Sequence, residues 1–368
     1  MRNLVGIGVG AAGVALLALL LTTAPAWGVG GEVSAPAWNF PPWMQNAAQP
    51  YKGYARGWAL ISPQELKHAM DLQKAWKTKI PLDDGTMPKA DPKLVIIDVG
   101  HPATQYRVDG HIPGAVNIWR PDYESAEKHW GVRGEDLMNR ADFEAFLRTL
   151  GIDNDSMVVW YDHKYDATRL WWACKLYGFE TRVLDGGIKA WKKADYEIDR
   201  LASADRPGNG TITLNDWGHP YLKVGRDAVW RCKDDPQWSL WDIRSEDEWT
   251  GHRKRVRRPG HIPWQTEGWH SWKDVHGEDG SFLTADELHA YTAKIGIKPT
   301  DHNVFYCQSG VRVTQTLFAL YLDGWPLEHL HIFDSSMIGW GNSPDLPVVD
   351  GEGKPVAAED AREVEVKD

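Results

Sequence analysis

Residues 304–313 read VFYCQSGVRV and join a short apolar run to an apolar helical pattern that reaches Gly324. Such a run, followed by a glycine-containing loop, is typical of a buried strand that leads into a helix. Cys307 stands directly after the strand, where backbone N–H groups and the helix N-terminus converge and stabilise a thiolate. The stretch therefore predicts an α/β unit whose nucleophile is Cys307, partly exposed at the edge of the sheet.

The same pattern occurs earlier in the chain. A strand-like run at 158–161 ends at Asp162, as the later run ends at Cys307. Another apolar run precedes each of them at a similar distance, since Asp98 lies 64 residues before Asp162 and Asp242 lies 65 residues before Cys307. Such spacing indicates an internal repeat. We therefore predict two α/β domains, each a mainly parallel sheet flanked by helices.

The helical patterns at 170–178 and 316–324 set the register between the two copies. In this register Cys174 takes the position of Leu320, which predicts that Cys174 is a buried core residue. A disulfide between Cys174 and Cys232 is the alternative, because an oxidising compartment favours pairing. The third cysteine, the nucleophile, is free in both interpretations.

The N-terminus has the charged, apolar and small-residue order of a secretory signal: Arg2, an apolar run over 4–21, and Ala24-Pro25-Ala26. We expect export, to the periplasm, with cleavage after Ala26. An uncleaved anchor is the alternative, and contact with a membrane is expected only in that case. The predicted segments are a signal peptide 1–26, an arm 27–50, a first domain 51–200, a linker 201–220, a second domain 221–350 and a polar tail 351–368.

Composition and charge restrict the partners. The 368 residues have a formal net charge of -10, whereas nucleic acid binding rewards clustered Lys and Arg. We therefore expect no nucleic acid partner. Small molecules or other proteins are the expected partners.

Several motifs occur in a fixed order: Gly-His-Ile-Pro at 110–113 and 260–263, Asp-x-Arg at 242–244, and Cys-x-x-Gly-x-Arg at 307–312. Together they resemble the tandem-domain rhodanese family of thiosulfate and 3-mercaptopyruvate sulfurtransferases, over nearly all of residues 51–350. The resemblance implies two rhodanese-like domains and a reaction in two steps. Cys307 would take a sulfane sulfur from a small anionic donor such as thiosulfate, and would pass it to cyanide or a thiol, including a thiol on a protein. No metal or organic cofactor is implied.

The candidate site residues follow from these motifs. Arg312 either binds the sulfonate end of the donor or forms a structural ion pair with Asp242. Arg244 is either an electrostatic helper or a support of the loop. Arg169 is a candidate for facing the cleft between the domains, as is Trp172, for which core packing is the alternative. The predicted active-site loop comprises Cys307, Gln308, Ser309, Gly310, Val311, Arg312 and Val313, supported by Asp242 and Arg244.

The first copy is predicted to be catalytically silent. It carries Asp162 at the position of the nucleophile, and a carboxylate cannot hold sulfane sulfur. This domain would serve as scaffold and cleft wall. His111 and His261 recur in both copies, the silent one included, which favours a structural role for each over metal binding or catalysis.

Two features depart from the family pattern. Glu248 stands where relatives tend to carry a second Arg, four residues after the Asp-x-Arg arginine, which weakens a claim to mercaptopyruvate. Residues 253–258 read RKRVRR, and these five cations either steer an anionic donor or form a solvated loop.

The length of the loop distinguishes two chemistries. Cys-based phosphatases and arsenate reductases use Cys-x5-Arg around a tetrahedral oxyanion, whereas this chain has Cys-x4-Arg, from Cys307 to Arg312. The shorter loop suits a single sulfur atom and makes those two activities minor alternatives. The alternative from a different class is a stoichiometric persulfide carrier outside the cytoplasm.

Overall fold

The structure is a computed structural model. The predicted signal peptide 1–26, the predicted arm 27–50 and residues 358–368 of the predicted tail lie outside the described part. Among the described residues, no helix combines the length and the apolar character needed to cross a membrane. The structure describes residues 51–357, apart from 126–127, 130–131, 134–135, 202–205, 216–217 and 267.

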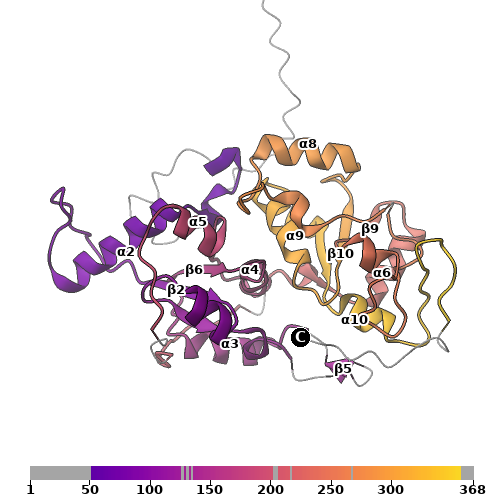
Figure 1. The fold of residues 1–368 in the computed structure, drawn as a ribbon, viewed down its shortest axis with the longest axis horizontal. Helices are drawn as coiled ribbons and strands as arrows, with labels where there is room; N and C mark the ends of the chain where they lie inside the picture. Colours follow the sequence, from indigo (N-terminus) through magenta and orange to yellow (C-terminus); the bar gives the residue numbers. More distant parts are fainter. Residues whose placement is uncertain are drawn as a thin grey trace, which may run out of the picture. The chain divides into compact units, whose positions relative to one another are not determined.

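Two parallel sheets organise the chain (Figure 1). The first has the strand order β1-β7-β6-β2-β3 and the second has the order β8-β11-β10-β9, with all neighbours parallel. This confirms the predicted α/β fold. The strands are β1 (Leu60–Ile61), β2 (Leu94–Val99), β3 (Val116–Ile118), β6 (Met157–Asp162), β7 (Arg182–Leu184), β8 (Lys223–Val224), β9 (Trp238–Asp242), β10 (His302–Tyr306) and β11 (Leu330–Phe333), with an antiparallel pair β4 (Lys128–His129) and β5 (Val132–Arg133).

Helices pack against both sheets, coloured indigo to magenta around the first sheet and salmon to yellow around the second in Figure 1. Strand β6 shows how both faces of a sheet are buried. Val159 and Tyr161 pack in one apolar cluster with Trp191 of α5, while Val158 and Trp160 pack in another. The helices are α2 (Pro63–Thr78), α3 (Arg140–Thr149), α4 (Ala167–Leu176), α5 (Gly187–Lys193), α6 (Arg226–Asp234), α7 (Glu246–Trp249), α8 (Ala285–Ile295), α9 (Val313–Leu322) and α10 (Ser336–Gly341).

Helices α4 and α9 share one apolar core. The rings of Trp171 and Phe318 lie 4.5 Å apart, edge to face. Cys174 on α4 is fully buried, as is Leu320 at the matching position of α9, so the core prediction for Cys174 is confirmed. Cys174 and Cys232 are both free, so the alternative disulfide is not formed. Because this core extends from one sheet to the other, the two halves are not independent bodies.

The aspartate that follows the last strand of each half binds the other half. Asp185 accepts a hydrogen bond from the backbone N–H of Phe282 at 2.8 Å. In the same way, Asp334 accepts one from the backbone N–H of Leu137 at 3.0 Å. Both carboxylates are buried, so each hydrogen bond is made in an environment of low dielectric constant. The two halves are thus joined by reciprocal polar contacts as well as by the shared core.

Both repeated histidines have structural contacts, as predicted. His111 Nδ1 lies 3.0 Å from the carbonyl oxygen of Tyr106, and the two rings stack with centroids 3.6 Å apart. His261 Nδ1 lies 2.9 Å from the carbonyl oxygen of Trp249, and those rings stack at 4.1 Å. Each imidazole therefore holds in place the chain segment of the aromatic residue on which it stacks, Tyr106 or Trp249.

The predicted linker 201–220 is partly packed rather than free. The N–H of Ile212 donates to the carbonyl oxygen of Ile152 at 3.1 Å. The side chains of Ile212 and Leu214 are buried in the core of the first half. Their alternation with two threonines is a short apolar pattern that its Gly- and Pro-rich surroundings obscured in the sequence.

Candidate active site

Cys307 lies at the carboxyl end of β10, between β9 and β11 and directly before α9. Its backbone is held on both sides by the first residues of α10. The N–H of Cys307 donates to Ser336 Oγ at 3.1 Å, and the carbonyl oxygen of Cys307 accepts from the N–H of Met337 at 3.2 Å. The nucleophile is therefore placed by contacts to a neighbouring strand-to-helix turn as well as by its own strand.

Ser336 was missed by sequence reasoning. Its φ of 47° lies in the left-handed region, which is strained for a residue with a side chain, and it is fully buried. In the first half the corresponding residue is Gly187, with a φ of 54°. Aligning Asp185-Gly186-Gly187 with Asp334-Ser335-Ser336 would have exposed the unusual serine. Its hydroxyl donates to the carbonyl of Phe333 and accepts from Cys307, which explains why a serine is kept there.

The loop after Cys307 forms a cradle of backbone amides. Gly310 has a φ of 76°, which turns the chain back toward α9. Within the described part of the chain, none of the N–H groups from 308 to 313 is hydrogen-bonded to another protein atom. Free amides at a helix N-terminus can hold an anionic sulfur. The arrangement can therefore stabilise a thiolate or a persulfide on Cys307.

Cys307 is fully buried, so the prediction of partial exposure was wrong. Its side chain packs in the shared apolar core with Phe305 and Val313. The next residue, Gln308, is also buried and donates through Nε2 to the carbonyl oxygen of Arg255 at 3.3 Å. The exposure of the thiol thus depends on packing contributed by distant segments, which a local motif does not report.

Arg312 forms an ion pair with Glu248 rather than with Asp242, the partner named in the structural one of its two predicted roles. Both guanidinium ends donate to the carboxylate, at 2.8 Å each. Burial by itself would raise the pKa of Glu248, but the hydrogen bonds and charge of Arg312, together with the charges of Arg244 and Arg255, hold it well below its usual range. The pKa of Arg312 is raised: burial opposes this, and Glu248 and the nearby Cys307 outweigh it. Arg312 is therefore a fixed cation beside the nucleophile.

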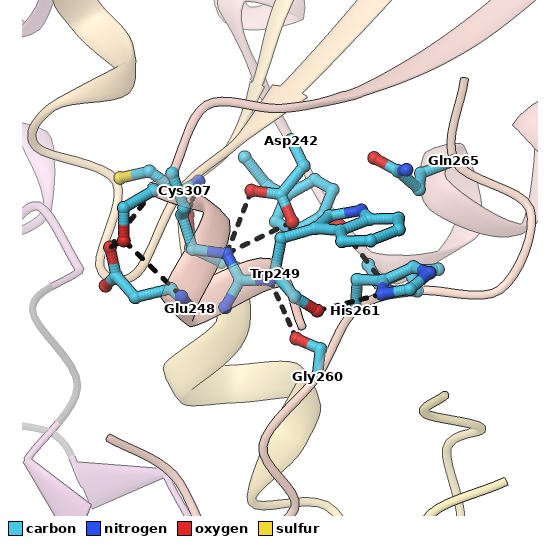
Figure 2. Close-up of polar contacts among 12 residues, drawn as sticks. Asp242, Glu248, Trp249, Gly260, His261, Gln265 and Cys307 are labelled. Atoms are coloured by element: carbon cyan, nitrogen blue, oxygen red, sulfur yellow. Dashed lines mark hydrogen bonds and ion pairs between the residues drawn. The ribbon is translucent and has the colours of Figure 1, made fainter. Parts of the chain in front are cut away.

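Asp242, labelled in Figure 2, forms a second, fully buried pair with Arg244. Arg244 Nη2 donates to Asp242 Oδ2 at 2.6 Å and to the carbonyl oxygen of Gly260 at 2.7 Å. These contacts make Arg244 a support that joins the end of β9 to the His-Ile-Pro segment at 261–263. Of its two predicted roles, the contacts match the support of the loop.

Arg169, a candidate for facing the cleft between the domains, lies buried at the contact between the two halves. It is fully buried, and its Nη1 donates to the carbonyl oxygen of Gly310 at 3.2 Å and to Asp334 Oδ1 at 2.5 Å. The guanidinium lies 4.7 Å from the ring centroid of Trp172, which is also buried in the core. A residue of the first half therefore contacts the catalytic loop of the second.

The basic run 253–258 divides into three parts. Arg258 is buried and donates to the backbone carbonyl of Trp340 in α10 and to those of Ser343 and Leu346 beyond its end. Arg255 is half-buried and forms an ion pair with Glu248 at 3.3 Å. Arg253, Lys254 and Arg257 are exposed. Two of the five cations are therefore part of the structure around the site rather than of a solvated loop.

In the loop at Asp162, two of the corresponding backbone amides are occupied by the aspartate itself. The Asp162 carboxylate accepts from the backbone N–H groups of Lys164 at 2.9 Å and Ala167 at 2.6 Å. Burial raises the pKa of this carboxyl to about 7. His163 Nε2 lies 3.0 Å from Asp98, in the role that Arg244 has toward Asp242. Asp162, at the position of Cys307, thus occupies two backbone amides of its own loop.

Comparison with known proteins gives a consistent result. A model of the rhodanese-like domain family matches residues 86–194. A probable 3-mercaptopyruvate sulfurtransferase of Pseudomonas aeruginosa is 32% identical over 278 residues, which cover 72% of this chain and 94% of that protein. A putative thiosulfate sulfurtransferase of Haloferax volcanii is 31% identical over 274 residues, covering 70% and 89%. The sulfur carrier protein TtuD of Thermus thermophilus is 29% identical over 283 residues, covering 71% and 93%.

Solved structures agree on the fold. The crystal structure of YnjE superposes with a TM-score of 0.65 at 24% identity, covering 83% of this chain and 71% of that one. An anaerobic ergothioneine biosynthesis enzyme from Chlorobium limicola superposes with a TM-score of 0.63 at 21% identity, covering 85% and 75%. At these identities the likeness concerns the fold alone.

Proposed function

We propose a donor and a reaction course for this chain, which belongs to the rhodanese family of sulfurtransferases. The chain takes the sulfane sulfur of thiosulfate onto Cys307 and passes it to a thiol or to cyanide. The observation that carries the proposal is the loop after Cys307, whose amides from 308 to 313 have no other partner in the described chain. No described group of three or more His, Cys, Asp or Glu has a metal-binding arrangement, and the proposal uses no metal.

The reaction follows from thiolate chemistry. The Cys307 thiolate attacks the outer sulfur of thiosulfate, a new sulfur–sulfur bond forms, and the bond to the sulfonate sulfur breaks with its electron pair leaving as sulfite. In the second step the acceptor attacks the outer sulfur of the persulfide. That sulfur–sulfur bond breaks, and the electron pair returns to Cys307 as thiolate. The loop amides hold the negative charge of the persulfide between the two steps.

Glu248 is our reason for choosing thiosulfate over mercaptopyruvate, because the names of the relatives include both donors. It places a carboxylate where family members tend to have a second anion-binding Arg, and this carboxylate occupies both ends of Arg312. A keto acid would therefore meet a negative charge at that position. Thiosulfate presents a compact sulfonate that a single arginine can bind.

Arg255 is the arginine best placed for this task. Its side chain is 32% exposed, compared with 12% for Arg312 and 2% for Arg244. Only one of its contacts to Glu248 is within hydrogen-bonding range, so most of its donors are available to a ligand. Its carbonyl oxygen is tied to Gln308, the residue after the nucleophile. Arg255 therefore has a partly exposed side chain that a donor can reach and a backbone carbonyl that is hydrogen-bonded to the Cys307 loop.

Replacing Arg255 with Gln is expected to raise KM for thiosulfate about tenfold while leaving kcat within about twofold, because a charge-assisted contact to the anion would be lost from the bound donor and the transition state alike. Steady-state thiocyanate formation gives both constants. Arg257→Gln is the matched control, since it removes the same charge from an exposed side chain of the same run. Equal increases in KM for the two variants would instead indicate general steering by the basic run.

A stoichiometric carrier is the second candidate, and two observations favour it. The sulfur carrier protein of Thermus thermophilus matches most of the chain, and the Cys307 thiol is fully buried, which suits storage of sulfur more than rapid exchange. Both candidates require the same persulfide. They differ in whether the persulfide is turned over by small acceptors.

Intact mass after incubation with thiosulfate tests the shared step. We expect a gain of one sulfur atom, mapped by peptide analysis to Cys307. Addition of cyanide should then give continuous thiocyanate formation if the chain is an enzyme, or a single equivalent if it is a carrier. Sulfur on Cys174 or Cys232 instead, or on no cysteine, would contradict the proposed reaction.

A further inference from the structure

We infer that Arg169 is a positioning residue for the Cys307 loop, through which the domain with Asp162 controls sulfur transfer in the domain with Cys307. The inference rests on the proposed function insofar as Cys307 is taken as the nucleophile. It gives the silent domain a task beyond that of scaffold and cleft wall. Arg169 is carried by α4 of the first half and contacts the backbone of the loop, through which it acts on Cys307.

The first contact fixes a peptide plane. Arg169 Nη1 donates to the carbonyl oxygen of Gly310 at 3.2 Å. In a trans peptide the carbonyl and the following N–H lie in one rigid plane and point in opposite directions. Holding the carbonyl of Gly310 toward Arg169 therefore points the N–H of Val311 away from Arg169. This N–H is one of the amides without another partner in the described chain.

The second contact reaches Cys307 from the other side. Arg169 also forms a buried ion pair with Asp334, at 2.5 Å. Asp334 begins the turn whose next residues bind the backbone of Cys307: Ser336 through its hydroxyl and Met337 through its N–H. One guanidinium thus holds both the loop that follows the nucleophile and the turn that anchors it.

The surroundings leave little freedom in this arrangement. A Cβ added to Gly310 would lie 2.6 Å from both the carbonyl and the carboxylate oxygen of Asp334, and 3.2 Å from Arg169 Nη1. Next to this contact, the hydroxyl groups of Thr168 and Thr314 form a hydrogen bond between the two halves, with 2.7 Å between their oxygens. Since the guanidinium is fully buried, water cannot replace its contacts at low free energy. A change at Arg169 should therefore displace the loop rather than be absorbed.

Lys223 provides a matched control. It forms an ion pair with the same carboxylate, Asp334, at 3.1 Å, and its Nζ lies 3.5 Å from the carbonyl oxygen of Leu137. It thus supports the same interface and the same aspartate, while its recorded contacts do not include the Cys307 loop. A purely structural role of Arg169 predicts similar consequences for Arg169→Met and Lys223→Met once their stabilities are matched.

The experiment compares Arg169→Met, Arg169→Lys and Lys223→Met in the full chain, with thermal unfolding, kcat and KM for thiosulfate, and the rate of Cys307 alkylation by neutral iodoacetamide. We expect Arg169→Met to lower kcat on the order of 10- to 100-fold with KM nearly unchanged, because misplaced catalytic groups affect the transition state more than binding. Arg169→Lys should recover part of kcat. Lys223→Met should keep kcat within about twofold of wild type at temperatures well below its own unfolding.

Equal kcat in the two Met variants would overturn the inference. If Arg169→Met does not fold, Arg169→Lys decides: unchanged kcat overturns the inference, and a lower kcat at an unchanged unfolding temperature supports it. Failure of the proposed function would look different, because wild-type protein would then gain no sulfur from thiosulfate. In that case the alkylation rates still compare the loop in the three variants.

Discussion

Replacing Cys307 with Ser is expected to abolish sulfur transfer, with thiocyanate formation falling to the uncatalysed rate. A serine hydroxyl is not ionised at neutral pH and cannot form a persulfide. The loop amides from 308 to 313 and the ion pair of Arg312 would remain. The activity would therefore be lost because the nucleophile is missing, and not because the surrounding site is disrupted. Because serine is close in size to cysteine, the unfolding temperature should change only modestly. Thiocyanate release and intact mass after thiosulfate measure the two consequences.

The other two cysteines serve as controls for this variant. Burial raises the pKa of Cys174 well above its usual value and raises the pKa of Cys232 to about 12. Neither is therefore an effective nucleophile near neutral pH. We expect Cys174→Ala and Cys232→Ser to retain kcat, with Cys174→Ala less stable because it leaves a cavity in the core. Sulfur transfer that survives Cys307→Ser would show that the nucleophile lies elsewhere.

The sequence was sufficient to predict the fold because its information is local and repeated. Strand β10 alternates core residues between its two faces, with Val304 and Tyr306 on one side and Phe305 on the other. The same order of strand, loop and helix recurs in the first half and predicts a second parallel sheet. The boundaries at 51–200 and 221–350 stay a prediction, since the apolar core is continuous across both halves.

The site was predicted only where its residues are neighbours in sequence. The motif from Cys307 to Arg312 identified the loop, but not the partner of Arg312, because Glu248 lies 64 residues away and is brought close by the fold. The same limit applies to the contact of Arg169 with Gly310, which spans 141 residues. Burial of the thiol results from such long-range packing. A local motif therefore predicts the nucleophile better than its environment.

The two loops also differ in a way that only three-dimensional contacts reveal. The internal repeat places the carboxylate of Asp162 where the second copy has the thiol, and on this ground the first copy is predicted to be silent. The structure adds that this carboxylate accepts hydrogen bonds from the N–H groups of Lys164 and Ala167 and so occupies two amides of its own loop. In the Cys307 loop, the N–H groups from 308 to 313 have no protein partner within the described part of the chain.

Gly310→Ala is expected to have the second-largest effect, lowering kcat on the order of 100-fold. Gly310 has a φ of 76°, where an alanine is strained by about 1–3 kcal/mol. Its new Cβ would also lie 2.6 Å from two oxygens of Asp334, a distance that real Cβ atoms do not tolerate. The loop must therefore move away from Asp334 and Arg169, and the amides that hold the persulfide move with it. Steady-state kcat and thermal unfolding give the two effects.

Gly114→Ala separates strain from displacement of the loop. Gly114 has a φ of 78°, nearly the same as Gly310, but an added Cβ would meet no atom within 4 Å. This control should lower stability by about 1–2 kcal/mol and leave kcat unchanged. If the two alanine variants had the same kcat, the position of the loop relative to Asp334 would not limit sulfur transfer. If only Gly310→Ala lowers kcat, the effect of Gly310 on kcat comes from the position of the loop amides rather than from the stability of the fold.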